Sequence, residues 1–121
     1  MQRDPRAFLW DVIHAGERLI SFTSGLDFAG YMADDLKRAG VERQFTIIGE
    51  ALSQLSKFDP AMAARVPDLA QIVSFRNLLI HGYAVIDHDR VWRIKESLLA
   101  ALLRDARTLL TEMDPGETTP P

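Results

Sequence analysis

The sequence contains no cysteine and only three histidines among its 121 residues. Without cysteine the chain can form neither a disulfide nor a thiolate metal site, and it offers no cysteine nucleophile. The histidines show neither a His-x3-His nor a His-Glu-x-x-His spacing, which argues against a transition-metal site. No apolar run approaches the roughly 18–20 residues of a membrane span, and the first residues lack the apolar stretch of a signal peptide. These absences predict a soluble, cytoplasmic protein with no metal, cofactor or membrane contact.

Positive charge is also scarce, because 17 acidic residues outnumber 14 basic ones and leave a net charge of −3. This balance argues against a protein that coats nucleic acid through bulk charge, but it permits a local basic patch. Apolar residues make up 47 % and charged residues 26 %, as in an ordinary folded protein. The length suits one domain. We expect that domain at 1–113 and a frayed, proline-containing tail at 114–121.

Apolar residues recur at helical spacing along nearly the whole chain, and no segment shows the alternation of a strand. The expected long helices cover residues 5–23, about 34–57, about 68–83 and 90–113, with short helical segments at 28–33 and after residue 60. Aspartates that precede helices are expected N-caps, among them Asp4, Asp27 and Asp89. The pattern predicts an all-α antiparallel bundle of four to five helices.

Two predicted apolar stripes define the expected core. The first comprises Phe8, Leu9, Val12, Ile13, Leu19 and Ile20, and the second comprises Val41, Phe45, Ile48, Leu52 and Leu55. Gly16 lies on the first stripe, where a missing side chain would let another helix approach closely. Gly40 and Gly49 weaken the second helix by about 1 kcal/mol each relative to alanine, so packing must hold that helix together.

The stretch Ile72–Tyr83 differs from an ordinary amphipathic helix. Apolar residues surround most of its circumference and leave a narrow polar strip of Ser74, Asn77 and His81. Arg76 falls within the apolar sector, where it needs a partner because burying a lone guanidinium costs several kcal/mol. Since a helix that is apolar nearly all round is buried on several sides, a second subunit is expected to cover it, and we predict a homodimer.

Arg76 and His81 permit two interpretations. In the structural one, a carboxylate such as Glu50 pairs with the arginine, and the histidine caps the helix end near Gly82. In the functional one, Asn77, four residues before His81, orients either the imidazole or a bound phosphate. Arg76 and His81 diverge by roughly 140° on an ideal helix. Two copies of this helix around a dimer axis are therefore better placed than one to build a shared cleft.

At these residues the sequence resembles a known family. The run Arg76–Tyr83 (RNLLIHGY) fits R-x4-H-x-Y, the signature of HepT-like toxins in the HEPN superfamily. Residues Ile47–Ala51 (IIGEA) are similar to a helix segment of that family, and Ile86–Trp92 is similar to its post-motif linker and helix start. The resemblance covers most of residues 5–110. Asp68–Gln71 departs from it, since many relatives carry a tryptophan after the preceding proline.

The resemblance implies a HEPN-like homodimeric bundle that acts as a metal-independent endoribonuclease. RNA supplies its own nucleophile, the 2′-OH, so the protein must provide a proton-transfer group and positive charge for the phosphorane. The implied catalytic residues are His81, with a pKa range suited to proton transfer, and Arg76, with a planar array of donors. Asn77 is the implied supporting residue. Glu50 lies opposite the apolar stripe of its own helix, where it either is solvated or reaches Arg76 from a neighbouring helix, and in the second case it is a further supporting residue.

The resemblance also implies a partner, a minimal nucleotidyltransferase antitoxin of a type II toxin–antitoxin system. In this family the antitoxin attaches AMP to the motif tyrosine, which corresponds here to Tyr83. A bulky anion beside the cleft would exclude RNA by size and by charge. The alternative is a tyrosine that simply packs at an interface.

The last predicted helix has a basic side, although the chain as a whole is acidic. Between Arg90 and Arg107 there are five basic residues and two acidic ones. Four arginines lie within about 100° of one another, opposite the apolar stripe: Arg90, Arg93, Arg104 and Arg107. A solvated face, a contact with RNA backbone and a contact with an acidic antitoxin surface are the three interpretations. His14, on the polar side of the first helix, and His88, in the linker, receive no functional role.

Two other functions compete with the ribonuclease hypothesis. One is a non-catalytic helical subunit that holds a nucleotide or substrate for a partner nucleotidyltransferase, and the other is a plain dimeric interaction module. The combination of Arg76, Asn77 and His81 favours catalysis, because a scaffold does not need it.

Overall fold

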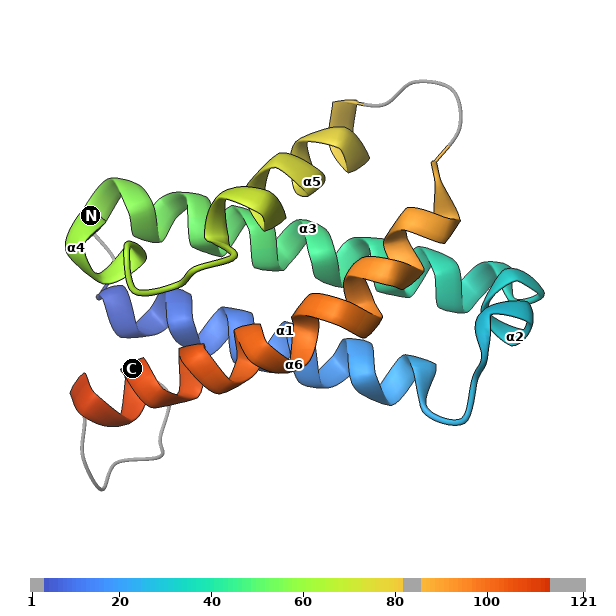
Figure 1. The fold of residues 1–121 in the computed structure, drawn as a ribbon, viewed down its shortest axis with the longest axis horizontal. Coiled ribbons are helices and arrows are strands. Elements are labelled where there is room, and N and C mark those ends of the chain that lie inside the picture. Colours follow the sequence, from blue (N-terminus) through green and yellow to red (C-terminus); the bar gives the residue numbers. More distant parts are fainter. Residues whose placement is uncertain (1–3, 82–85, 114–121) are drawn as a thin grey trace.

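The computed structural model describes residues 4–81 and 86–113, which form six helices and no strand (Figure 1). The helices are α1 (Pro5–Thr23), α2 (Phe28–Met32), α3 (Asp35–Phe58), α4 (Pro60–Ala63), α5 (Leu69–His81) and α6 (His88–Met113). The all-α class is confirmed for the described residues. The predicted tail at 114–121 lies outside them.

The two short segments predicted at 28–33 and after residue 60 are both helical, so the described residues hold four long helices and two short ones, and an aspartate caps each short helix. Asp27 Oδ1 accepts a hydrogen bond from the backbone N–H of Gly30 at 2.8 Å and starts α2. Asp59 Oδ1 accepts from the N–H of Met62 at 3.1 Å and starts α4. A side-chain cap satisfies an otherwise unpaired N–H of the first turn, so even one or two turns become stable here.

The predicted cap of the last helix is wrong. Asp87, rather than Asp89, accepts a hydrogen bond from the backbone N–H of Arg90, at 3.1 Å. The helix α6 therefore begins at His88, two residues before the predicted start. Two aspartates two residues apart offer the same local signal, and the sequence does not choose between them.

The long helices are antiparallel to their neighbours, as predicted (Figure 1). The first helix, α1, packs against both α3 and α6, and α5 packs on α3. In Figure 1, α5 lies at the periphery of the bundle, above α3 and away from α1. Among the described residues, this arrangement leaves one side of α5 uncovered.

The core follows the two predicted stripes with one exception. All five residues of the α3 stripe are buried, as are five of the six in the α1 stripe, but Ile20 is 45 % exposed. Gly16 does permit a close approach, since a Cβ there would lie 3.0 Å from Cγ of Leu103 on α6. Within the described residues, no helix is both long enough and apolar enough to cross a membrane.

Candidate functional site

The motif helix α5 is covered on one side only. Ile72 and Phe75 are buried, and the Phe75 ring meets Phe45 of α3 edge-on with a centroid separation of 5.3 Å. Away from these two residues, Leu78 is 51 % exposed, and Ile80, one turn after Arg76, is 45 % exposed. The expected burial of α5 on several sides is therefore not achieved by this chain alone. Its completion by a second subunit stays a prediction.

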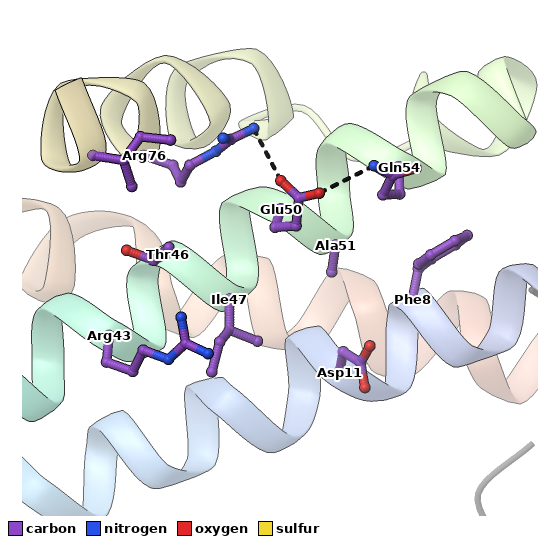
Figure 2. A pocket seen from close by; sticks show the side chains of 10 residues that line it. Phe8, Asp11, Arg43, Thr46, Ile47, Glu50, Ala51, Gln54 and Arg76 are labelled. Atoms are coloured by element: carbon purple, nitrogen blue, oxygen red, sulfur yellow. Dashed lines mark hydrogen bonds and ion pairs between the residues drawn. The ribbon is translucent and has the colours of Figure 1, made fainter.

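Arg76 projects from the flank of α5 over α3 and pairs with Glu50 (Figure 2). Its side chain is 14 % exposed, and its Nη2 lies 3.3 Å from Oε2 of Glu50. The side-chain amide of Gln54 donates to Oε1 of the same carboxylate at 3.0 Å. The Nε of Arg76 is buried and has no hydrogen-bond partner. The carboxylate partner that the structural interpretation requires is thus present, yet the guanidinium is not fully satisfied.

Gly49 explains how Arg76 comes so close to α3. A Cβ on Gly49 would lie 2.6 Å from Cγ of Arg76, and closer still to its Cβ. Real Cβ atoms do not pack at such separations, so the glycine sets how near α5 can lie to α3. Two adjacent residues of α3 therefore position the arginine. Gly49 leaves space for its side chain, and Glu50 pairs with its guanidinium.

Arg76 lines a groove of about 270 Å³ between α1, α3 and α5 (Figure 2). The other polar side chains around the groove are Asp11, Arg43, Thr46, Glu50 and Gln54, and the apolar ones are Phe8, Ile47, Ala51 and Ile80. Sequence reasoning missed Arg43, Thr46 and Gln54. Their spacing of three or four residues from one another and from Glu50 places them on one face of α3, and this was the available signal.

His81 and Asn77 lie elsewhere on α5. Both side chains are exposed, and neither lines the groove beside Arg76. His81 is the last residue of the helix, whereas Arg76 is turned toward α3. The single chain therefore does not bring Arg76 and His81 to one point, in agreement with the divergence predicted from helical geometry. Tyr83 lies outside the described residues.

The predicted basic side of α6 does not form one continuous surface of free charges. Arg104 Nε lies 3.8 Å from Oδ1 of Asp105, and Arg107 Nη2 lies 3.9 Å from Oε1 of Glu17 on α1. These are exposed ion pairs, which contribute little to stability and still reduce the net charge of the surface.

Arg90 and Arg93, at the start of α6, have different surroundings. They line a second groove, of about 470 Å³, together with Gln71 of α5. The Cζ of Arg90 lies 6.0 Å from the centroid of the Phe75 ring, and no carboxylate in the described residues pairs with its guanidinium. Arg93 Nε lies 3.1 Å from Oδ2 of Asp89, and both side chains of that pair are well exposed.

Comparison with known proteins identifies the family. The family described as Ribonuclease HepT-like matches residues 12–109, which include the whole of α3 and α5. The chain belongs to the HepT-like ribonuclease family. Among the described residues, no group of three or more His, Asp or Glu side chains is placed to hold a metal ion.

The relatives of this HepT-like chain cover most of its length. It is 33 % identical over 93 residues to a protein of Methanocaldococcus jannaschii whose name describes it as an RNase, covering 77 % of this chain and 84 % of that one. It is 27 % identical over 99 residues to a protein of Thermococcus cleftensis named as a ribonuclease HepT, covering 81 % and 89 %. No solved structure matches the chain. Family membership and these relatives support a ribonuclease activity.

One buried polar cluster of this HepT-like chain was missed by sequence reasoning. Tyr31 is fully buried, and its hydroxyl lies 3.4 Å from Nδ1 of His88, which in turn lies 4.0 Å from Oε2 of Glu42. Burial raises the pKa of Tyr31 to about 12 and also raises the pKa of Glu42. No local signal could have linked Tyr31 to His88, because 57 residues separate them. The cluster ties α2 and α3 to the first residue of α6.

Proposed function

We propose that this HepT-like chain is a metal-independent endoribonuclease with a composite site, in which Arg76 and His81 come together at a homodimer interface. The observation that carries the proposal is Arg76, which α3 holds beside a groove with its Nε unpartnered, in a chain of the HepT-like ribonuclease family. A purely structural arginine would be expected to have all its buried donors satisfied.

The proposed reaction uses the 2′-OH of the RNA substrate as nucleophile. The imidazole of His81 takes the 2′-OH proton as the oxygen attacks phosphorus, the P–O5′ bond breaks, and the leaving 5′-oxygen takes a proton from solvent. The products are a 2′,3′-cyclic phosphate and a 5′-OH. Arg76 stabilises the negative charge on the non-bridging oxygens in the transition state, because its planar guanidinium donates two parallel hydrogen bonds. Asn77, on the same exposed side as His81, orients the imidazole or the phosphate.

A homodimer supplies what the single chain lacks. Arg76 and His81 diverge on one helix, but a two-fold axis beside α5 can bring His81 of one chain toward Arg76 of the other. Leu78 and Ile80 are exposed apolar residues of α5, and exposed apolar surface is typical of an interface. We therefore propose that α5 packs against α5 of a second copy.

The test of the activity is cleavage of RNA in the presence of EDTA. We expect the parent protein to cut RNA, and we expect His81→Ala and Arg76→Ala to abolish cutting while the far-ultraviolet circular dichroism stays helical. His14→Ala is the matched control, since His14 is an exposed histidine on α1. Strict dependence on Mg²⁺ or Zn²⁺ would contradict the mechanism, as would full activity of His81→Ala.

We further propose that the chain is the toxin of a type II toxin–antitoxin system and that a nucleotidyltransferase antitoxin modifies Tyr83. The phenol oxygen would attack the α-phosphorus of ATP, form an O–P bond and release pyrophosphate. Tyr83 follows His81 by two residues in the sequence. A phosphate added there would compete with RNA for the guanidinium of Arg76 through charge-assisted hydrogen bonds.

Co-expression with the cognate nucleotidyltransferase tests this modification. Mass spectrometry should find one or more AMP units on Tyr83, and the modified protein should lose ribonuclease activity while it keeps its helical content. Tyr83→Phe should remain toxic and escape silencing by AMP transfer. AMP on another residue, or a Tyr83→Phe protein that AMP transfer still silences, would contradict the proposal.

A further inference from the structure

The second groove, between α5 and the start of α6, is lined almost entirely by polar side chains. It measures about 470 Å³, and its lining residues are Gln71, Asp87, Arg90, Arg93, Ile94 and Ser97. Protein-docking surfaces usually have a desolvated apolar centre, and here Ile94 is the one apolar residue among the described residues of the lining. The available donors are two guanidinium groups and an amide, because the Ser97 hydroxyl already donates to the backbone carbonyl of Arg93 at 2.6 Å. Such a set fits a phosphodiester and its ribose better than an apolar protein surface.

Arg90 is the cation best prepared to bind an anion in this groove. Its guanidinium is held at 6.0 Å from the centroid of the Phe75 ring and has no carboxylate partner in the described part of the chain. The carboxylate of Asp87 is already engaged, because it caps α6 by accepting from the backbone N–H of Arg90. The guanidinium of Arg90 can therefore donate charge-assisted hydrogen bonds, and its contact with Phe75 holds it in place before an anion binds.

Arg93 adds a second positive charge, and its present carboxylate partner can be replaced by a phosphate. It pairs with Asp89 on the surface, where side-chain exposures of 67 % and 63 % keep the pair hydrated. Exposed pairs of this kind contribute on the order of 0–1 kcal/mol, so a phosphate can replace the carboxylate at little cost.

The groove lies at one end of a polar path that leads to His81. Gln71 lines the groove, and Ser74 and His81 follow it on the exposed side of α5. Gln71 and His81 are ten residues apart, which corresponds to about 15 Å along the helix axis. A strand cut at the dimer cleft beside His81 would need only a few nucleotides to span that distance and reach the groove.

We propose that the Arg90–Arg93 groove binds the phosphate backbone of the RNA strand that flanks the cleavage point. This inference rests on the proposed ribonuclease function and adds a track for the substrate outside the catalytic residues. It selects, from the four arginines of the basic side of α6, the two that line a groove next to α5. Arg104 and Arg107, farther along α6, take no part in it.

The experiment measures binding of a single-stranded RNA to a His81→Ala chain, which leaves the RNA intact, over a series of salt concentrations. In this background Arg90→Gln/Arg93→Gln should weaken binding to all sequences alike. Two lost phosphate contacts should lower the slope of log K against log salt by about 1.4 in magnitude. Arg104→Gln/Arg107→Gln is the matched control, with the same charge change on the same helix, and should leave the slope unchanged. Circular dichroism checks the fold of each variant, and Arg93→Gln alone leaves the contact between Arg90 and Phe75 in place.

Each contrary outcome has a separate meaning. If both double variants weaken RNA binding equally, net charge rather than the groove is responsible, and the inference is wrong. If the groove variant binds RNA normally but no longer binds the cognate nucleotidyltransferase, the groove is a protein-docking surface and the inference is overturned. In both cases RNA cleavage by the parent chain would leave the proposed function standing. A parent chain that neither cuts nor binds RNA would overturn both.

Discussion

Gly49 of α3 and Arg76 of α5 are in such close contact that a Cβ on the glycine would lie 2.6 Å from Cγ of the arginine. The next residue, Glu50, holds the guanidinium at 3.3 Å. The position of the candidate catalytic arginine therefore depends on two adjacent residues of a neighbouring helix, one through its lack of a side chain and one through its charge.

Gly49→Ala should destabilise the protein and reduce RNA cleavage. The added methyl group must push α5 away from α3, and overpacking of this kind costs about 1–3 kcal/mol. The gain of about 1 kcal/mol in helix propensity offsets only part of that loss. Urea denaturation measures the stability, and cleavage assays measure the displacement of Arg76.

Gly40→Ala is the matched control on the same helix. Its Cβ would lie 3.1 Å from the edge of the Phe22 ring, which is only half-buried and can move aside. We expect this variant to be neutral or slightly stabilised. Equal stability of the two variants would show that the contact between Gly49 and Arg76 does not set the helix separation.

Glu50→Gln should lower kcat for RNA cleavage more than it changes KM, because the carboxylate positions Arg76 without touching RNA. The substitution removes the charge and keeps the shape, so the mostly buried guanidinium loses its counter-ion. We expect a loss of about 1–2 kcal/mol in the free energy of unfolding, between the values for exposed and buried pairs.

Glu50→Asp, which keeps the negative charge, should restore part of kcat. Glu112→Gln, which breaks the fully exposed pair between Arg65 and Glu112, should leave kcat unchanged. A Glu50→Gln enzyme with native kcat would argue against the positioning role.

Leu78→Glu should convert the proposed dimer to a monomer without loss of helix. A charge in the centre of an apolar interface is desolvated without a partner, which opposes association. Light scattering at micromolar concentration gives the mass of each species. Leu36→Glu is the control, since Leu36 is 83 % exposed and lies on α3 away from α5. A parent chain that is already monomeric would rule out the composite site.

The helices were predictable because their signals are local. Apolar periodicity and capping aspartates fix the existence of all four long helices, and the stripe on α3 is buried at every predicted position. Ile20 was predicted wrongly for a physical reason. It is the last residue of the α1 stripe, near the end of the helix, and whether such a position is covered depends on where the neighbouring helices lie.

The sequence predicted which residues belong to the candidate site but not how they pack. Arg76 and His81 follow from the motif, and Glu50 was one of the carboxylates expected to pair with the arginine. The sequence did not show that Gly49 lets Arg76 pack against α3. From the sequence alone, a glycine within a helix indicates only a lower helix propensity, and it does not show which side chain of another helix occupies the space beside it. The link between Tyr31 and His88 was equally inaccessible, since it joins residues far apart in the chain.

Tyr31 should titrate far above an ordinary tyrosine. Burial raises its pKa to about 12, whereas the pKa of a tyrosine in the unfolded chain is about 10. A raised pKa means that the folded state holds the phenol proton more tightly. The resulting stability is fully present below pH 10 and is lost as the pH rises toward about 12. The Tyr83→Phe chain isolates the effect, because the sequence has only two tyrosines. Its tyrosinate absorbance should therefore appear near pH 12 in the folded protein.

The comparison that decides this prediction is between Tyr83→Phe and Tyr31→Phe/Tyr83→Phe. The second chain keeps the buried ring, which packs at 5.1 Å from the Trp92 ring, but has no phenol to ionise. Between pH 10 and 12 the free energy of unfolding should therefore fall more steeply for the chain that retains Tyr31, because only in that chain does unfolding expose a buried phenol that then ionises. Lysine titration contributes equally to both curves and cancels in the difference. Parallel curves, or tyrosinate absorbance near pH 10 while circular dichroism still reports a folded bundle, would show that solvent reaches the Tyr31 hydroxyl.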